Sequence, residues 1–324
     1  MSKQMVAQLQ PGQTVESPFA VSQKSLIPFK SKPGHYLAMT LTDKTGSMPA
    51  RVWDNAEKIN EQCRVGDIAA VSGRVEEYRG SLQIIVNQCR VCEEAEFEKD
   101  DFLPSGKKDH TDLLEKVSGF INQVENKYLR QLLEAFFSDP EFVAAFSQAP
   151  GAKALHHSHL GGLLEHTVGV VEILLTVEEI HPELDRDLLI SGALLHDIGK
   201  LEELQAEHTI DYTDTGRLVG HIVHTDRMVT RAIEKIDGFP PELADQLCHI
   251  LLSHHGQKEY GAPVVPMTAE ACALHYADNL DAHVQYFQQV IDHGLQTGNR
   301  WSEYQRLFDR YIYIGDGREK ETKE

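Results

Sequence analysis

The first third of the chain shows short runs of alternating apolar and polar residues, which predict β-strands. Asp43-Lys44-Thr45-Gly46 separates two of these runs and predicts the turn of a β-hairpin. A short polar helix is expected over residues 55–63. The predicted strands include residues 36–41, 48–53, 68–75 and 82–86. Five strands and one helix between about residues 14 and 92 suggest a small closed barrel.

The pattern changes after residue 92. Residues 93–101 are strongly charged, and Pro104-Ser105-Gly106 then breaks any regular element, so the segment 93–110 is interpreted as an acidic linker. Beyond it, apolar residues recur at spacings of three and four, which is typical of helices. The predicted helices cover residues 111–124, 128–137, 140–146, 162–177, 187–195, 218–236, 242–252, 269–291 and 302–312. The expected fold is therefore multidomain, with an all-β barrel over residues 1–92 and an all-α domain over residues 111–324.

Composition supports a folded chain with two cores. Of the 324 residues, 41% are hydrophobic and 25% are charged, which is typical of a soluble globular protein. No apolar run approaches the roughly 20 residues that span a bilayer, and the first residues lack a signal-peptide core. We expect a cytoplasmic protein with no membrane partner. Five cysteines fit a reducing compartment, and the one close pair, Cys89 and Cys92, is interpreted as two strand-end residues.

The net charge of −19 at first argues against nucleic-acid binding, because phosphate contacts need Lys and Arg. The charge is uneven, however. Residues 1–92 hold eleven Lys and Arg against eight Asp and Glu, a net of +3, so the rest of the chain carries −22. An acidic domain can still bind a polyanion if metal cations supply positive charge at its active site.

The chain contains 17 histidines, and several of them lie within or at the end of apolar helical stretches. A buried imidazole or carboxylate without a partner is costly, so such groups on different helices are expected to converge on a shared partner. Neutral imidazole and carboxylate together suit Mn, Fe, Zn, Co or Ni. The candidate metal ligands are His166, His196, Asp197, His221, His254, His255 and Asp278.

This ordered series resembles that of the HD-domain metal-dependent phosphohydrolases, whose adjacent pair is matched by His196-Asp197, and the resemblance covers about residues 110–310. It implies that one metal ion is held by His166, His196, Asp197 and Asp278. A second ion would share Asp197 and use His221 and His254, with His255 as an alternative or additional contact. Two such cations can activate water and position a phosphate, which suits phosphodiester hydrolysis.

Three further residues near this series are candidates for supporting roles. Lys200 lies one helical turn after Asp197, and the HDxGK resemblance implies a contact with substrate phosphate, although a helix C-terminal lysine has a structural explanation too. His157, with neighbouring histidines, precedes Gly161-Gly162 and is a candidate for substrate contact. Asp281, three residues after Asp278, is a candidate for orienting a metal ligand.

The N-terminal strands resemble those of the OB-fold nucleic-acid-binding modules related to the anticodon-binding type. Such barrels bind single strands by stacking bases on aromatic side chains while Lys and Arg follow the backbone. The candidate nucleic-acid-binding residues are Tyr36, Lys44, Arg51, Trp53, Arg74, Tyr78 and Arg79. For each of them, core packing or an ordinary surface position is an equally open interpretation.

The combination of barrel, acidic linker and HD series, with the runs GGLLEHT and LLHDIGK, resembles the YhaM-type 3′-to-5′ exoribonucleases over about residues 12–315. The resemblance implies manganese-dependent release of nucleoside monophosphates from the 3′ end of single-stranded RNA. Single-stranded DNA as a second substrate, a homo-oligomeric state, and Fe, Co, Ni or Zn in place of manganese remain open.

Three alternatives use the same residues differently. The metal ions could act on a small nucleotide or a cyclic nucleotide, although the run after His255 lacks the Gly-Tyr-Pro of the cyclic-dinucleotide enzymes. A related HD branch uses two irons for oxygenation. In the third alternative, the chain is a non-catalytic single-strand-binding protein with the HD domain as a scaffold, which the complete ligand series disfavours.

Overall fold

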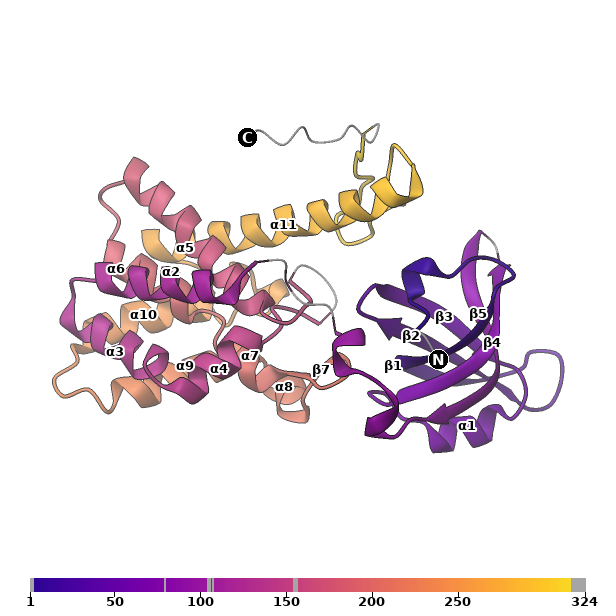
Figure 1. Ribbon diagram of the computed structural model, residues 1–324. Coiled ribbons are helices and arrows are strands. Elements are labelled where there is room, and N and C mark those ends of the chain that lie inside the picture. Colours follow the sequence, from indigo (N-terminus) through magenta and orange to yellow (C-terminus); the bar gives the residue numbers. More distant parts are fainter. Residues whose placement is uncertain (1–2, 79, 104–105, 107, 154–156, 316–324) are drawn as a thin grey trace. The chain divides into compact units, whose positions relative to one another are not determined.

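The computed structural model describes residues 3–78, 80–103, 106, 108–153 and 157–315. The chain forms two compact units, each with its own apolar core (Figure 1). The first unit contains residues 1–107 together with 204–212, and the second contains residues 108–203 and 213–324. The main boundary between them lies within the charged segment that follows the last strand of the barrel.

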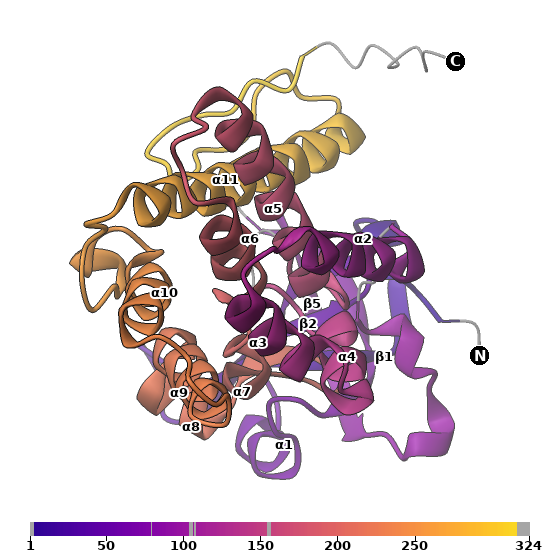
Figure 2. The same cartoon turned by 90° about the vertical axis from the view of Figure 1, so that its left-hand side faces the viewer.

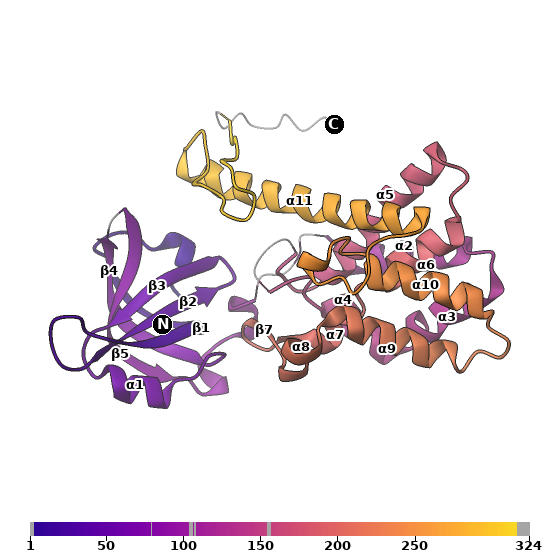
Figure 3. The ribbon, with the colours of Figure 1, turned by 180° about the vertical axis from the view of Figure 1, so that it is seen from behind.

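The first unit is the predicted OB-fold barrel, a closed sheet with the strand order β1-β2-β3-β5-β4 (Figures 1 and 3). Its strands are β1 (Thr14–Pro28), β2 (His35–Asp43), β3 (Gly46–Val52), β4 (Ile68–Tyr78) and β5 (Ser81–Val91), with the helix α1 (Ala56–Gln62) between β3 and β4 in the chain. The first half of β1 pairs with β4 and its second half with β2, with a register shift between Val21 and Gln23. The parallel pairing of β3 with β5 completes the closure.

The predicted turn between β2 and β3 is held by a buried carboxylate. Asp43 Oδ1 accepts a hydrogen bond from the Thr45 backbone N–H at 2.8 Å, as in an Asx-turn. Its other oxygen, Oδ2, accepts from the backbone N–H of Val6 at 2.8 Å and lies 3.2 Å from Lys3 Nζ. One side chain therefore shapes the hairpin and ties the N-terminal segment, with its short 3₁₀ turn Val6–Gln8, to the barrel.

The barrel core follows from the alternation along each strand. In β2, every second residue from Leu37 onward is buried, and Phe19 of β1 is fully buried among these side chains. The charged segment after β5 forms two single-turn 3₁₀ helices, Glu94–Glu96 and Lys99–Asp101. Phe102, which follows them, packs on the outside of the barrel against Ile68. Residues 94–102 are therefore ordered against the barrel.

A small hairpin from later in the chain also belongs to the first unit. It consists of β6 (Leu204–Ala206) and β7 (Ile210–Tyr212). His208, between the two strands, has Nδ1 3.1 Å from the Gly66 carbonyl oxygen, and its ring lies edge-on to Phe97 with 5.3 Å between the ring centres. Three-residue strands carry too little alternation for the sequence to predict them.

The second unit is helical. Its helices are α2 (His110–Gln123), α3 (Lys127–Phe137), α4 (Pro140–Gln148), α5 (Gly162–Ile180), α6 (Arg186–Leu195), α7 (Lys200–Glu203), α8 (Asp214–Val219), α9 (His221–Ile233), α10 (Pro241–Ser253) and α11 (Ala269–Thr297), with a 3₁₀ turn at Lys258–Tyr260. Figure 2 shows α6 enclosed by α2, α3, α5, α10 and α11, all of which pack against it. Every residue of α6 from Leu188 to Leu195 is buried, so this helix lies at the centre of the core.

Two of the helices predicted from periodicity are not as expected. Residues 302–312 are not helical: the segment folds back on itself, with β-bridges from Trp301 to Tyr313 and from Gln305 to Arg310 and a left-handed turn at Asp309 (φ 53°). Phe308 of this segment packs against Tyr286 and Phe287 of α11, so an apolar residue at a helical spacing is half-buried here without a helix. The predicted helix 218–236 is divided at Gly220, whose φ of 78° ends α8 and starts α9.

Among the described residues, no helix is both long and apolar enough to cross a membrane.

Candidate functional site

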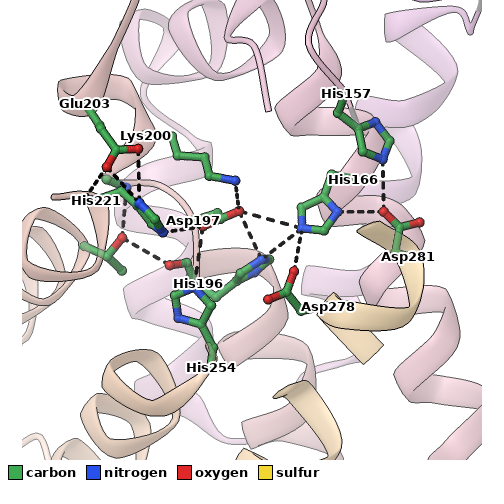
Figure 4. Close-up of polar contacts among 12 residues, drawn as sticks. His157, His166, His196, Asp197, Lys200, Glu203, His221, His254, Asp278 and Asp281 are labelled. Carbon is green, nitrogen blue, oxygen red and sulfur yellow. Dashed lines mark hydrogen bonds and ion pairs between the residues drawn. The ribbon is translucent and has the colours of Figure 1, made fainter. Parts of the chain in front are cut away.

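The seven predicted metal ligands come from five places in the helical unit and form one cluster. Figure 4 shows this cluster and labels all of these residues except His255. They are His166 on α5, His196 and Asp197 in the turn between α6 and α7, His221 at the first position of α9, His254 and His255 after α10, and Asp278 on α11. A β-carbon on Gly199 would lie 2.1 Å from the His221 carbonyl oxygen, so only glycine lets the turn after Asp197 approach α9 this closely.

Asp197 lies at the centre of this cluster, and its two oxygens face opposite sides. Oδ2 is 3.3 Å from His196 Nε2 and 3.7 Å from His166 Nε2. Oδ1 is 3.5 Å from His221 Nε2 and 3.7 Å from His254 Nε2. A carboxylate with one pair of imidazole nitrogens beside each oxygen has the geometry of a bridging ligand.

All five ligand histidines have the same orientation. In each ring Nδ1 is within 2.6–3.0 Å of an oxygen, so it carries the proton, and Nε2 faces the centre of the cluster. The oxygen partners of Nδ1 are Asp281 for His166, the Ala193 carbonyl for His196, Glu203 for His221, the Leu251 carbonyl for His254 and the Tyr260 carbonyl for His255. In a neutral imidazole, this tautomer directs the Nε2 lone pair at the centre of the cluster, where a metal ion can bind it.

The cluster fits a metal centre on two further observations. Asp197 Oδ1 and His254 Nε2 are buried and have no hydrogen-bond partner among the described residues, which is costly unless a ligand satisfies them. The Nε2 atoms of His166 and His196 approach to 3.3 Å, and so do those of His221 and His255. Two nitrogens bound to one ion at about 2.0–2.1 Å lie at about this separation.

The electrostatics around Asp197 and His254 favour the protonation states that bind metal. Burial would raise the pKa of Asp197, but Lys200 and His196 hold it well below its usual range. Burial, together with the nearby His255, lowers the pKa of His254 well below its usual value. Asp197 is therefore ionised and His254 is neutral, which are the states required of metal ligands.

Asp281, which is predicted to orient a metal ligand, makes hydrogen bonds with two histidine rings. Its Oδ2 accepts from His166 Nδ1 at 2.6 Å and from His157 Nε2 at 3.0 Å. Burial opposes a charge on His166, yet the hydrogen bonds to Asp278 and Asp281 raise its pKa to about 9, so a metal ion that binds Nε2 must displace a proton from this ring. His157 is only 2% exposed and its ring lies 5.3 Å from that of His166, so its side chain belongs to the layer behind the ligands.

Lys200 and Glu203 lie on the single turn of α7, on the other side of the cluster. Lys200 Nζ is 2.6 Å from Asp197 Oδ2, and its side chain is 12% exposed. Glu203 Oε1 accepts from both the backbone N–H and Nδ1 of His221, each at 3.0 Å. The sequence did not reveal Glu203, because an acidic residue on a short helix has no distinctive spacing.

On the barrel, two of the predicted aromatic residues lie together. The ring centres of Tyr36 and Trp53 are 5.0 Å apart, and Phe29, which is not among the predicted binding residues, lies 5.7 Å from Tyr36 and 6.1 Å from Trp53. Lys32 Nζ lies 4.2 Å from the centre of the Phe29 ring. Trp53 is 44% exposed, so this aromatic cluster offers a surface on which a base can stack.

The other predicted binding residues of the barrel are not part of this aromatic cluster. Lys44 pairs with Asp101 at 2.9 Å, and Arg51 donates to the Ala50 carbonyl. Arg74 Nε donates to the Gly12 carbonyl at 3.2 Å. Tyr78 is exposed at the end of β4, and Arg79 lies outside the described residues.

Comparison with known proteins finds the same two parts. Residues 163–283 match the family model of the HD domain, and residues 21–92 match the model of the OB-fold nucleic acid binding domain. Among solved structures, the second OB-fold domain of replication protein A from Methanococcus maripaludis is 24% identical, covers 30% of this chain and 100% of its own, and has a TM-score of 0.25.

Two proteins named 3′-5′ exoribonuclease YhaM are similar over most of the chain. The protein from Bacillus pumilus (strain SAFR-032) is 32% identical over 259 residues, which is 80% of this chain and 82% of its own. The protein from Geobacillus sp. (strain WCH70) is 32% identical over 258 residues, 79% of each chain. This identity and coverage, together with the HD domain and the OB-fold, show that the chain belongs to the YhaM family of 3′-5′ exoribonucleases, hydrolases that act on phosphodiester bonds.

Proposed function

We propose that this enzyme removes nucleoside monophosphates one at a time from the 3′ end of single-stranded RNA, at a centre that binds two divalent metal ions. The observation that carries the proposal is the position of Asp197, whose two oxygens each face a separate pair of imidazole nitrogens. Imidazole and carboxylate ligands suit manganese as well as iron, cobalt, nickel and zinc. We propose manganese as the working ion.

The ligands divide into two sets around Asp197. The first ion would be held by His166, His196, Asp197 and Asp278. The second would be held by Asp197, His221, His254 and His255. The ring of His221 lies close to the rings of both His254 and His255, which is why these three are assigned to one ion. When bound, the two ions supply an activated water and neutralise negative charge on the phosphodiester in the transition state.

The surrounding side chains hold the ligands and the substrate in place. Glu203 and Asp281 fix the rings of His221 and His166, so their Nε2 atoms stay directed at the centre. Lys200 neutralises Asp197 and is the proposed contact for a substrate phosphate oxygen. His157 is buried and bonded to Asp281, so we propose a positioning role for it in place of the substrate contact expected from the sequence.

The barrel is the proposed binding module for the single strand. Stacking on Phe29, Tyr36 and Trp53 needs only the flat face of a base, so it tolerates any sequence. It also does not require a 2′-hydroxyl, so single-stranded DNA is a second proposed substrate. Lys32, beside Phe29, is the proposed phosphate contact.

The test compares two RNAs that differ only at the 3′ end. A 5′-labelled single strand with a free 3′-hydroxyl and one with a blocked 3′ end are each incubated with the protein, with manganese or with a chelator. We expect a ladder that shortens from the 3′ end, needs manganese and stops at the block. The released product should be nucleoside monophosphate.

Two variants link this activity to the centre. Asp197→Ala should abolish the ladder, whereas the matched change Asp245→Ala, at an exposed position of α10, should leave it intact. RNA that stays intact with manganese-loaded protein would overturn the proposal. Hydrolysis of small nucleotides by the same sample would then support the small-substrate alternative.

A further inference from the structure

The metal centre is part of a longer row of imidazole rings. His166, His196, His254, His255 and His221 follow one another with 4.5–5.3 Å between successive ring centres. The row continues beyond His166 to His157 at 5.3 Å and then to His159 at 6.0 Å. The two proposed metal ions use neither His157 nor His159, and the contact of His157 Nε2 with Asp281 leaves the role of its other ring nitrogen and of His159 to be explained.

The backbone holds His157 in an unusual conformation. Its φ of 54° lies in the left-handed region, which a residue with a β-carbon rarely adopts. Residues held in such rare backbone conformations are found most often at functional sites. Two glycines press against it: a β-carbon on Gly151 would lie 2.7 Å from the His157 β-carbon, and one on Gly162 would lie 2.0 Å from the His157 carbonyl oxygen. The Gly151 N–H donates to that oxygen at 2.9 Å. These contacts fix the backbone at His157, and the contact of Nε2 with Asp281 holds its ring.

Glu165, on the first turn of α5, faces the same place. Its side chain is 8% exposed, and Oε1 is buried without a hydrogen-bond partner among the described residues. A buried carboxylate oxygen without a partner is costly, because water no longer solvates it. A cation bound beside the described residues would satisfy this oxygen.

We propose that His157, His159 and Glu165 form a third divalent-cation site beside the two-metal centre. Each residue offers one ligand atom, and these atoms all lie within 4.8 Å of one another. Two nitrogens and one carboxylate oxygen suit Mn, Fe, Co, Ni or Zn. His159 Nδ1 lies 3.0 Å from the Leu160 carbonyl oxygen, so the ring presents Nε2.

Asp281 couples this site to the centre. Its Oδ2 accepts from His157 Nε2 and from His166 Nδ1, so one carboxylate orients a ligand of the third site and a ligand of the first ion. His159 is only half-buried, which leaves the third site open on one side. A cation there adds positive charge to a domain that is otherwise strongly acidic, next to the place where a polyanionic substrate must bind.

The experiment counts metal ions on the full-length protein and does not depend on RNA cleavage. Wild type, His159→Ala and Glu165→Gln are dialysed to equilibrium against manganese chloride, and bound manganese per chain is measured by mass spectrometry. We expect three ions on the wild type and two on each variant. The matched controls are His293→Ala, exposed on α11, and Glu179→Gln, exposed on α5, and both should keep three.

The same comparison is made in the Asp197→Ala background, which weakens the two-metal centre. The His159→Ala change should still remove one ion there, because Asp197 is not a ligand of the third site. If His159→Ala and Glu165→Gln both bind as much manganese as wild type, there is no third site. Should Glu165→Gln fail to fold, as judged by its thermal melting, His159→Ala decides alone. Intact RNA in the cleavage assay would overturn the proposed function without changing this count.

Discussion

The barrel and the helical unit bury polar side chains in different ways. In the barrel, buried Asp43 has partners for both oxygens, including Lys3, and its role is to hold a turn. In the helical unit, Asp197 and His254 are at most 3% exposed, and each has one polar atom that accepts or donates no hydrogen bond within the part of the chain that the structure describes. An unsatisfied buried polar atom costs about 1–3 kcal/mol. A buried polar side chain with all its hydrogen bonds made stabilises the fold, whereas buried polar atoms without such bonds indicate a ligand-binding site.

The proposed RNA-binding groups of the barrel lie instead on its surface. Trp53 is 44% exposed, and the aromatic cluster that it forms with Phe29 and Tyr36 has no buried polar atom to satisfy. If these roles are correct, loss of one such ring should weaken RNA binding in part, whereas loss of the bridging ligand should abolish hydrolysis. The two units should therefore respond to mutation on very different scales.

The largest effect is expected for Asp197→Ala. Because Asp197 faces both sets of imidazoles, its loss should lower the affinity for both metal ions and abolish RNA hydrolysis. The barrel lies in the other unit and should still bind single-stranded RNA. Cleavage and binding are measured on the same preparation by gel assay and fluorescence anisotropy. Wild-type turnover in this variant would remove Asp197 from the mechanism, and a parallel loss of RNA binding would contradict the separation of roles.

Removal of metal should affect the two units unequally. Each ion that binds only the folded state, at a concentration of 100 times its Kd, stabilises that state by about 2.7 kcal/mol. A chelator should therefore lower the stability of the helical unit and leave the barrel unchanged. Hydrogen exchange followed by mass spectrometry can check this. The chelator should speed up exchange in α5, α6, α9 and α11 and leave the exchange rates of β1–β5 unchanged. Equal losses in both units would show that metal stabilises the barrel as well.

The same contrast explains what the sequence could predict. The ligand series was readable because metal chemistry restricts residue type, so His166, His196, Asp197 and Asp278 stand out within apolar helices. The structure brings all of them to one point. Strand alternation likewise predicted the barrel, and Asp43-Lys44-Thr45-Gly46 its hairpin.

What the sequence could not predict depends on contacts between distant segments. Glu203 acquires its role only because α7 meets the start of α9, and Phe29 only because its loop folds over Trp53. Residues 302–312 look helical in sequence but fold back on α11, since docking of Phe308 there replaces the helix. Neither residue spacing nor composition contains this information.

An intermediate effect is expected for Glu203→Gln. The change keeps the size of the side chain but removes the charge that holds His221 Nδ1, and loss of such a partner typically costs 10–100-fold in metal affinity. The manganese concentration for half-maximal activity should rise by about this factor. Activity at saturating manganese should largely return, which a general folding defect would not permit. An unchanged manganese dependence would show that His221 needs no such partner.

A smaller effect is expected for Trp53→Ala. Stacking of a base on an aromatic ring contributes about 1–3 kcal/mol, so affinity for a long single strand should fall on the order of tenfold. Cleavage of a very short oligonucleotide should change less, because a short strand makes less use of the barrel. Trp301→Ala is the matched control, since Trp301 is 57% exposed but lies in the helical unit. Equal losses on long and short substrates would contradict the binding role of the barrel.

The smallest effect concerns the charges beside the aromatic cluster. Each phosphate contact on a single strand contributes a slope of about −0.7 to the dependence of log affinity on log salt. Lys32 lies over the ring of Phe29, so Lys32→Ala should make this slope shallower by about 0.7 if its ammonium pairs with one phosphate. Arg74 already donates to the Gly12 carbonyl, so Arg74→Ala should change the slope less. Salt titrations of RNA binding measure both variants. If Arg74→Ala changed the salt slope more than Lys32→Ala, the RNA backbone would run along β4, where Arg74 lies, and away from the aromatic cluster.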